Sequence, residues 1–310
     1  MTALKDHNIT VFEMPDDYEG HVISTLVSLP ATEKSSVAIL YIHGYQDYYF
    51  QEHIGNYFAS RGKNFYAIDL RKYGRSYLPN QHFNYCRNLN EYYPDIDMAM
   101  DRILADGNTD IVLMGHSTGG LLAALYASDG ERRAFIDRVI LNSPFLEFNM
   151  NWPVRNIIIP VAGVLGRIFP YMHIKSPLSL NYFESLHSSA YGEWEFDQAL
   201  KPRKGAPLYF AWVRSIRKGH KKVKRGLHIP VPVLVMSSDK STYYRSWNEE
   251  ARVSDTILNV KHIMKYGAML GDNVQLEEIE SGLHDLVLSK NDVRDKVLKI
   301  MDYFAESHRS

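Results

Sequence analysis

The chain has 310 residues, of which 45% are hydrophobic and 23% charged, a composition typical of a globular protein with a large buried core. Lysine and arginine (35) nearly balance aspartate and glutamate (36), so the net charge of −1 provides no overall attraction to nucleic acid or an anionic membrane. No apolar run approaches the ~18 residues of a membrane span. The single cysteine, Cys86, excludes an internal disulfide and is consistent with a cytoplasmic location.

The order of apolar runs along the chain predicts an α/β protein. Residues 9–13 and 21–29 alternate apolar and polar around a turn, which predicts an antiparallel pair at a sheet edge. Later runs are short and continuously apolar, as in parallel strands buried on both faces. They cover residues 37–42, 65–68, 111–114, 139–141, 233–236 and 274–279. Helical patterns lie between them at residues 50–61, 93–106, 119–129, 257–270 and 291–306. We therefore expect a mostly parallel, doubly wound sheet.

One interval interrupts this alternation. More than 80 residues between Pro144 and Pro230 contain no clear parallel-strand pattern and are rich in proline and aromatic residues. A structureless loop of that length is rare in a compact domain, so we predict an inserted, mainly helical subdomain at residues 145–228. Residues 1–144 and 229–310 then form the core. An insertion between such strands lies over their carboxyl ends, where ligands bind, and we interpret it as a cap.

The strongest motif is Gly115-His116-Ser117-Thr118-Gly119. It follows an apolar strand and precedes a helical pattern, so it predicts a sharp strand–turn–helix that exposes a nucleophilic serine. Glycines on either side of Ser117 allow the helix and the strand to approach closely. The alternative is a turn that needs small residues only for packing. Cys86, in a polar stretch without such a turn, is a poor competitor for the nucleophile.

A second motif, His43-Gly44-Tyr45, follows the first parallel strand. A turn at Gly44 would direct the backbone N–H of Tyr45 toward the serine, beside the N–H of Thr118. Two such donors form an oxyanion hole, each worth roughly 3–4 kcal/mol to the reaction. His43 itself is better interpreted as a structural histidine.

The general base is expected late in the chain, with an acid between nucleophile and base. His284, in Gly282-Leu283-His284-Asp285, directly follows the last apolar strand and precedes the terminal helix. That position is the carboxyl edge of the sheet, where a loop brings the imidazole to Ser117. We therefore predict that His284 is the base.

Two residues qualify as the acid. Asp239 directly follows a strand, and Asp255 precedes a helical pattern. Either could have a local role instead, Asp239 in a turn and Asp255 as a helix N-cap. Asp255 lies 29 residues before His284, enough for one helix, a turn and one strand, whereas Asp239 lies 45 residues before it. The spacing favours Asp255, with Asp239 as the alternative.

These residues resemble the monoacylglycerol-lipase-like and lysophospholipase-like α/β-hydrolases, which share a domain with serine aminopeptidases. The resemblance extends over nearly all of the chain beyond residue 35. It depends on five stretches: His43-Gly44, residues 66–76, residues 115–120, Asp255-Thr256-Ile257-Leu258 and residues 282–285. It implies an α/β-hydrolase fold with Ser117 as nucleophile, His284 as base, Asp255 as acid and backbone donors at Tyr45 and Thr118. The stretch 237–253 departs from the pattern, like an insertion ahead of the acid.

The resulting hypothesis is a serine hydrolase that cleaves a small carboxylic ester with an apolar acyl group, without metal or organic cofactor. A Ser-His-Asp triad would act through an acyl-enzyme. Peptidase or thioesterase activity on the same scaffold is the first alternative, and a non-catalytic ligand-binding hydrolase is the second. The cap aromatics are predicted to line an apolar pocket or to form the cap's own core. These are Trp152, Phe169, Tyr171, Tyr182, Phe183, Trp194 and Phe196.

A basic run covers residues 214–225. Such a run is usually a solvated helix face, and contact with a membrane surface or an acidic headgroup is the alternative. The oligomeric state and the physiological ester cannot be predicted from the sequence.

Overall fold

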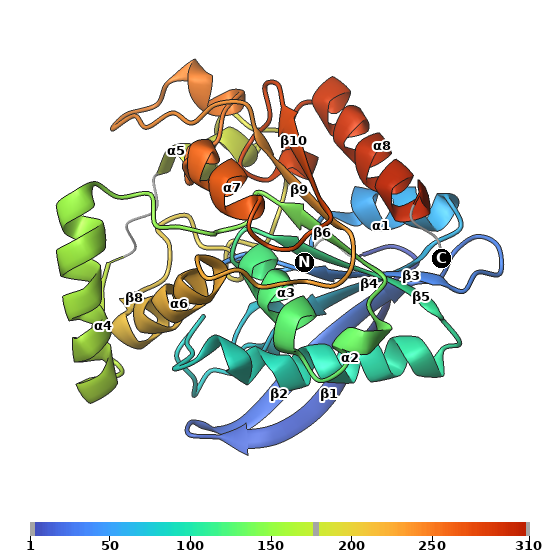
Figure 1. Ribbon diagram of the computed structural model, residues 1–310, viewed down its shortest axis with the longest axis horizontal. Coiled ribbons are helices and arrows are strands. Elements are labelled where there is room, and N and C mark those ends of the chain that lie inside the picture. Colours follow the sequence, from blue (N-terminus) through green and yellow to red (C-terminus); the bar gives the residue numbers. More distant parts are fainter. Residues whose placement is uncertain (1–3, 176–179, 308–310) are drawn as a thin grey trace.

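An eight-stranded sheet forms the centre of the molecule (Figure 1) in the computed structural model, which describes residues 4–175 and 180–307. Its strands are β1 (Asn8–Asp17), β2 (Gly20–Leu29), β3 (Val37–Ile42), β4 (Asn64–Asp69), β5 (Asp110–His116), β6 (Arg138–Asn142), β9 (Val233–Ser238) and β10 (Val274–Ile279). Their spatial order is β1-β2-β4-β3-β5-β6-β9-β10. Only β1–β2 and β2–β4 pair antiparallel, and the remaining neighbours are parallel. The predicted antiparallel edge and parallel sheet are therefore confirmed.

Helices cover both faces of this sheet. The ones packed directly on it are α1 (Glu52–Ser60), α2 (Tyr93–Ala105), α3 (Thr118–Asp129), α7 (Val260–Gly267) and α8 (Asn291–Ser307). Successive side chains of a strand point to opposite faces, so each central strand contributes to two apolar cores. In β3, Leu40 packs with α2 and α3 on one face, whereas Ile39 and Tyr41 pack with α1 and α8 on the other. This two-sided burial explains the continuous apolar runs.

The helices agree with their predicted ranges to within two residues, except α7, which was predicted over residues 257–270 and ends at Gly267. Its start also differs. The periodic pattern begins at residue 257, but the helix begins at Val260. The side chain of Asn259 accepts a hydrogen bond from Lys261 N at 3.0 Å and caps the helix there. The amides of Ile257 and Leu258 are bonded to Asp255 instead.

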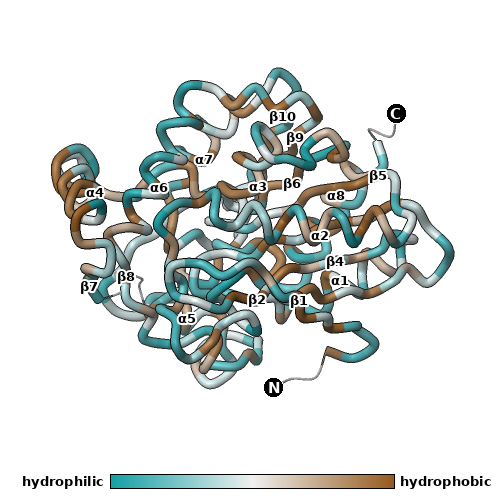
Figure 2. Tube along the Cα trace, turned by 90° about the horizontal axis from the view of Figure 1, so that it is seen from below, coloured by the Kyte–Doolittle hydropathy of each residue, from teal (hydrophilic) through white to brown (hydrophobic). Residues whose placement is uncertain are grey.

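The segment 145–228 leaves the sheet after β6 and returns at β9. It contains η4 (Val154–Ile158), α4 (Ile159–Ile168), β7 (His173–Ile174), α5 (Leu180–Leu186), β8 (Leu208–Tyr209) and α6 (Phe210–Val223). In the described residues none of these joins the main sheet, and β7 pairs only with β8. That short strand pair was not predicted. The helices α4 and α6 lie side by side at one end of the molecule (Figures 1 and 2). Among the residues that the structure describes, no helix combines the length and hydrophobicity needed to cross a membrane.

Candidate active site

Ser117 occupies a strained turn between β5 and α3. Its φ of 53° and ψ of −116° lie outside the regions that a non-glycine residue normally adopts. A methyl group at Gly119 would lie 2.3 Å from the carbonyl oxygen of His43, and one at Gly115 would lie 2.4 Å from that of Gly119. Only glycine therefore allows the helix, the elbow and β3 to pack this closely. The strain and the close packing are what the sequence motif predicted for this turn.

His284 bridges the serine and a carboxylate. Its Nε2 lies 3.0 Å from Ser117 Oγ, and its Nδ1 lies 2.9 Å from Asp255 Oδ2. All three side chains are buried, and Ser117 retains 8% of its exposure. The other carboxylate oxygen of Asp255 accepts from the amides of Ile257 at 2.8 Å and Leu258 at 2.7 Å. These bonds hold one carboxylate oxygen and leave the other, Oδ2, for the imidazole.

The loop after β9 explains how Asp255 reaches this position. The backbone amide of Asp255 donates to Lys240 O, and the backbone carbonyl of Asp255 accepts from Thr242 N, both at 3.0 Å. Residues 243–254 thus form an excursion that closes on itself and returns the chain to the end of β9. Asp239 lies beside that return point, is exposed, and accepts from Ser281 N at 3.0 Å. Of the two predicted acids, the described contacts join only Asp255 to His284.

The predicted oxyanion-hole residues lie beside Ser117. A methyl group at Gly44 would lie 3.2 Å from Ser117 Cβ, so the backbone ahead of Tyr45 passes against the serine. Thr118 is the first residue of α3, where amides lack intrahelical acceptors. His43 accepts from Leu70 N at Nε2 (3.1 Å) and bonds the Gly44 carbonyl through Nδ1 (2.8 Å). Burial lowers the pKa of His43, so a neutral imidazole holds this turn in place.

Sequence reasoning missed a buried polar network beneath the triad. Lys201, from the segment 145–228, places its Nζ 2.6 Å from Asp47 Oδ1. Asp285 accepts from Asn142 Nδ2 at 2.7 Å and from Gln51 Nε2 at 3.2 Å. Burial alone would raise the pKa of Asp285, but His116, Lys201 and these amides outweigh it and lower that pKa. In the sequence, the position of Asp285 next to the predicted base was the one indication of this network. No sequence pattern indicated that Asp47 pairs with Lys201, because the two residues are 154 positions apart.

Within the described residues, one group of side chains has the composition and spacing of a metal site. Its members are Asp47, His116 and Asp285, whose ligating atoms lie within 4.8 Å of one another. Both carboxylates are already engaged, Asp47 by the Lys201 ammonium and Asp285 by two amides. The arrangement is better described as an ionic network whose positive charge is supplied by Lys201.

The predicted aromatic residues of the segment 145–228 divide into three groups. Tyr182 stands over the base, with its ring centroid 5.4 Å from that of His284. Phe183 and Phe196 are buried in the core on the α1 side. The remaining ones lie partly or largely at the surface: Trp152, Phe169, Tyr171 and Trp194. The seven side chains therefore neither all line an apolar pocket nor all form a core of the segment 145–228.

The structure adds aromatic residues that were not predicted at the site. Phe145 donates its amide to Ser117 O at 2.9 Å, and Trp212 of α6 packs on Tyr45 at a centroid distance of 4.3 Å. Cys86, the alternative nucleophile, is unreactive by comparison. Burial raises the pKa of its thiol to about 12, which disfavours the nucleophilic thiolate.

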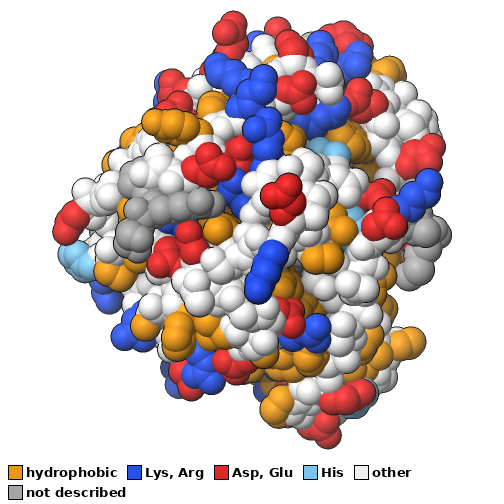
Figure 3. Space-filling model, turned by 90° about the vertical axis from the view of Figure 1, so that its right-hand side faces the viewer, with side chains coloured by type: hydrophobic (Ala, Val, Ile, Leu, Met, Phe, Trp, Pro, Cys, Tyr) orange, Lys and Arg blue, Asp and Glu red, His pale blue; other side chains and the backbone are white. Residues whose placement is uncertain are grey.

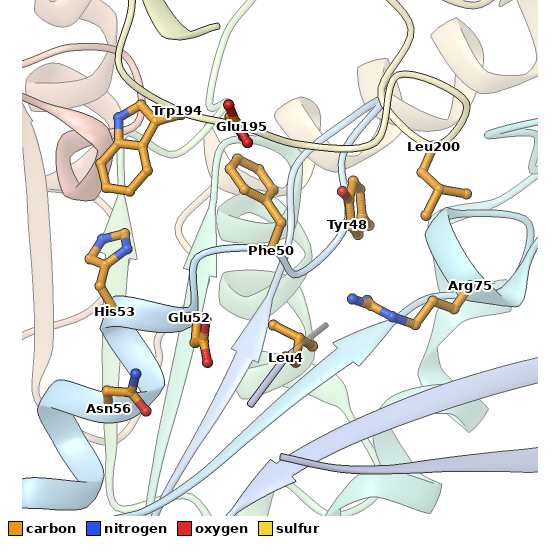
Figure 4. Close-up of a pocket in the computed structure, with 10 residues that line it drawn as sticks. All are labelled: Leu4, Tyr48, Phe50, Glu52, His53, Asn56, Arg75, Trp194, Glu195 and Leu200. Carbon is orange, nitrogen blue, oxygen red and sulfur yellow. The ribbon is translucent and has the colours of Figure 1, made fainter. Parts of the chain in front are cut away.

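A separate pocket of about 330 Å³ lies between α1 and residues 194–200 (Figure 4). His53 stacks on Trp194 with centroids 4.6 Å apart, and Arg75 lies over the Tyr48 ring. Ser117, Asp255 and His284 are not among its lining residues. This pocket therefore does not mark the candidate active site.

The sheet topology and the position of the site define an α/β-hydrolase: the elbow follows β5, and the histidine follows β10, the last strand in the described chain. Residues 33–287 match the model of the hydrolase family described as serine aminopeptidase, S33. The chain belongs to this family, as the motif resemblance predicted.

Similar proteins include ones named as lipases or as a probable lysophospholipase. A probable lysophospholipase L2 of Haemophilus influenzae is 25% identical over 200 residues, which cover 62% of this chain and 58% of that protein. The chain thus matches less than two thirds of that relative. A soluble variant of Saccharomyces cerevisiae monoglyceride lipase has a TM-score of 0.73 at 17% identity, with 96% of this chain and 95% of that chain covered. Paleococcus ferrophilus monoacylglycerol lipase has a TM-score of 0.67 at 17% identity, with 97% and 100% covered. These structural similarities concern the fold.

Proposed function

We propose that the protein hydrolyses carboxylic esters with an apolar acyl group, using Ser117 as nucleophile, His284 as base and Asp255 as acid. The observation that carries this proposal is the bridge made by His284, which contacts Ser117 Oγ at 3.0 Å and Asp255 Oδ2 at 2.9 Å. A serine in a strained elbow, a buried imidazole and a fixed carboxylate are the parts that acyl transfer requires.

In the first step His284 takes the Ser117 proton. The carboxylate of Asp255 already receives two amide bonds, so it is an acceptor and holds Nδ1–H of His284 toward itself. Nε2 is then free of a proton and accepts one from Oγ as the oxygen attacks the ester carbonyl. His284 returns this proton to the departing alcohol, which leaves Ser117 acylated.

In the second step water replaces the alcohol. His284 removes a proton from water, the resulting hydroxide attacks the acyl carbonyl, and Ser117 recovers its proton as the acid departs. The backbone N–H groups of Tyr45 and Thr118 would stabilise both tetrahedral oxyanions. Their support is the close approach of Gly44 to Ser117 and the position of Thr118 at the start of α3.

The apolar acyl group is inferred from aromatic residues near the triad. The ring of Tyr182 stands over His284, the ring of Trp212 packs on Tyr45, and the backbone N–H of Phe145 donates to Ser117 O. All three come from the segment 145–228, which we propose is a cap over the site. Similar proteins are named as a monoglyceride lipase and a probable lysophospholipase, and a lipid-ester substrate agrees with this choice.

A fluorophosphonate probe tests the proposal, because it labels only an activated serine. We expect the intact protein to be labelled and Ser117→Ala to lose both labelling and ester hydrolysis, by at least about 10³-fold. Ser143→Ala, at a buried serine outside the triad, is the matched control and should retain labelling. Absence of labelling in the folded wild-type protein would contradict the proposal.

A panel of p-nitrophenyl esters of increasing chain length then measures the acyl preference. Aminoacyl p-nitroanilides in the same assay test the peptidase suggested by the family description. Faster turnover of the anilides than of every ester would replace the esterase assignment with a peptidase.

A further inference from the structure

The helix α4 exposes a row of large apolar side chains. We define the α4 face as Ile157, Ile158, Val161, Val164 and Ile168, which recur at helical spacing along η4 and α4. Their exposed fractions run from 53% to 62%. Trp152 and Phe169, at the two ends of this row, are 63% and 54% exposed. Much of α4 is brown in Figure 2, where this helix lies at the outer end of the molecule.

The opposite side of α4 is already packed. A methyl group at Gly166 would lie 2.3 Å from the Phe210 backbone, and one at Gly163 would lie 3.7 Å from Arg214. The glycines thus bring α4 directly against α6 and turn the branched side chains outward. An exposed apolar surface of this kind is rare on a monomeric protein unless it binds a membrane, a ligand or another protein.

The two chain segments that contain α4 and α6 carry charged residues of one sign only. No aspartate or glutamate occurs between Phe148 and Leu180 or between Ala206 and His228. We define the cationic cluster as Arg167, Arg214 and Lys218, which form no ion pair with the described acidic residues. Arg214 and Lys218 lie one turn apart on α6, and Arg167 lies on α4, which packs against α6. Partial burial lowers the pKa of Lys218, and repulsion from Arg214 and Arg167 lowers it further. By contrast, the face in Figure 3 mixes both signs of charge.

We propose that the α4 face and the cationic cluster dock on the surface of an anionic phospholipid bilayer. Apolar side chains of an interfacial helix enter the boundary between headgroups and acyl chains, while nearby cations bind lipid phosphates. Trp152 is an aromatic residue of the kind enriched at this boundary, and Phe169 is typical of the apolar face of an interfacial helix. Docking does not depend on Ser117. Its consequence, delivery of lipid esters to the segment that covers the triad, rests on the proposed function.

Co-sedimentation of the full chain with vesicles tests the apolar part. We expect the protein to pellet with vesicles that contain phosphatidylglycerol and less with pure phosphatidylcholine. The triple variant Ile158→Asp, Val164→Asp and Ile168→Asp should bind at least about tenfold more weakly, because it places charges where apolar side chains enter the bilayer. The matched control is Val11→Asp, Phe135→Asp and Tyr303→Asp, three residues at least 50% exposed elsewhere, which should bind like the wild type.

A second set of variants tests the charge. Arg167→Gln, Arg214→Gln and Lys218→Gln together should remove the preference for phosphatidylglycerol, whereas the exposed set Lys261→Gln, Lys296→Gln and Lys299→Gln should retain it. All variants should hydrolyse a soluble short-chain ester like the wild type, which shows that they fold. Ser117→Ala should still bind vesicles, which separates docking from catalysis.

Three results would overturn the docking proposal. One is a wild-type protein that pellets with neither vesicle, and another is equal binding by the α4 variant and its control. The third is a dimer in solution that the α4 variant converts to a monomer, since the α4 face would then be an interface between two copies.

Discussion

At the residue scale, the strained backbone of Ser117 and the fixed carboxylate of Asp255 are the two features on which the proposed chemistry depends. A serine with φ of 53° costs of order 1–3 kcal/mol, which the packing of α3 against β3 and β5 offsets. Asp255 is oriented by the amides of Ile257 and Leu258, so its free oxygen can only face His284. The two residues are thus held by backbone contacts that the motif residues make possible.

The choice between the two acids is testable at this scale. In Asp255→Asn the amide can keep its oxygen on Ile257 N and Leu258 N, and its NH₂ then faces His284 and favours the wrong tautomer. We expect hydrolysis of an activated ester to fall by about 10³- to 10⁴-fold with little change in stability. Asp239→Asn, at an exposed position, should change the rate by less than about threefold. A larger loss in Asp239→Asn than in Asp255→Asn would contradict the assignment.

At the element scale, the turn after β3 is tied to the segment 145–228 by three successive residues. Tyr45 Oη donates to Pro207 O and Gln46 Nε2 donates to Ala206 O, both at 3.1 Å. The next residue, Asp47, pairs with Lys201 at 2.6 Å. Because Tyr45 is a proposed oxyanion donor, the position of this segment and the geometry of the donor are coupled.

Removing the Lys201 ammonium tests that coupling. Lys201→Met leaves the buried Asp47 carboxylate without its cation, which we expect to cost about 3–5 kcal/mol of stability. On a soluble ester, kcat should fall roughly 10- to 100-fold with KM nearly unchanged, because a displaced donor affects the transition state most. Adding Asp47→Asn should recover stability. Lys204→Met, at an exposed lysine nearby, is the control, and equal losses in the two single variants would contradict the coupling.

At the scale of the whole molecule, buried neutral histidines link stability to pH. Burial lowers the pKa of His53 and of His220 to about 4. The unfolded chain binds these protons near pH 6.5, so between about pH 6.5 and pH 4 it holds more protons than the folded chain. Stability is therefore complete above this window and is lost as the pH falls through it.

Urea unfolding at two pH values measures this effect. Between about pH 7 and pH 5 each histidine should remove about 2 kcal/mol of folding free energy. His53→Gln can still donate to Val287 O and should show a pH dependence about 2 kcal/mol shallower than the wild type. His21→Gln, at a largely exposed histidine, serves as the control. An unchanged slope in His53→Gln would refute the role of that residue.

Much of the fold was predictable because both faces of the central strands are buried. Burial forces continuous apolar runs in β3, β5 and β9, and these runs can be read without knowing which strands are neighbours. The start of α7 was less predictable, since the hydrophobic period continues across residues whose amides bind Asp255. The pair β7–β8 was missed because two-residue strands have no period to detect.

The sequence by itself determined the class of fold, the strained serine and the histidine after the last strand. Each of these depends on residues close together in the chain, through glycines that a sharp turn requires or through the spacing of buried apolar residues. The sequence favoured Asp255 over Asp239 as the partner of His284, and the tertiary structure decided between them, since the return of the loop after β9 is set by hydrogen bonds at Lys240 and Thr242. The tertiary structure alone paired Lys201 with Asp47 and turned the apolar residues of α4 outward. Contacts between distant segments depend on how whole elements pack, and one sequence contains no local pattern for them.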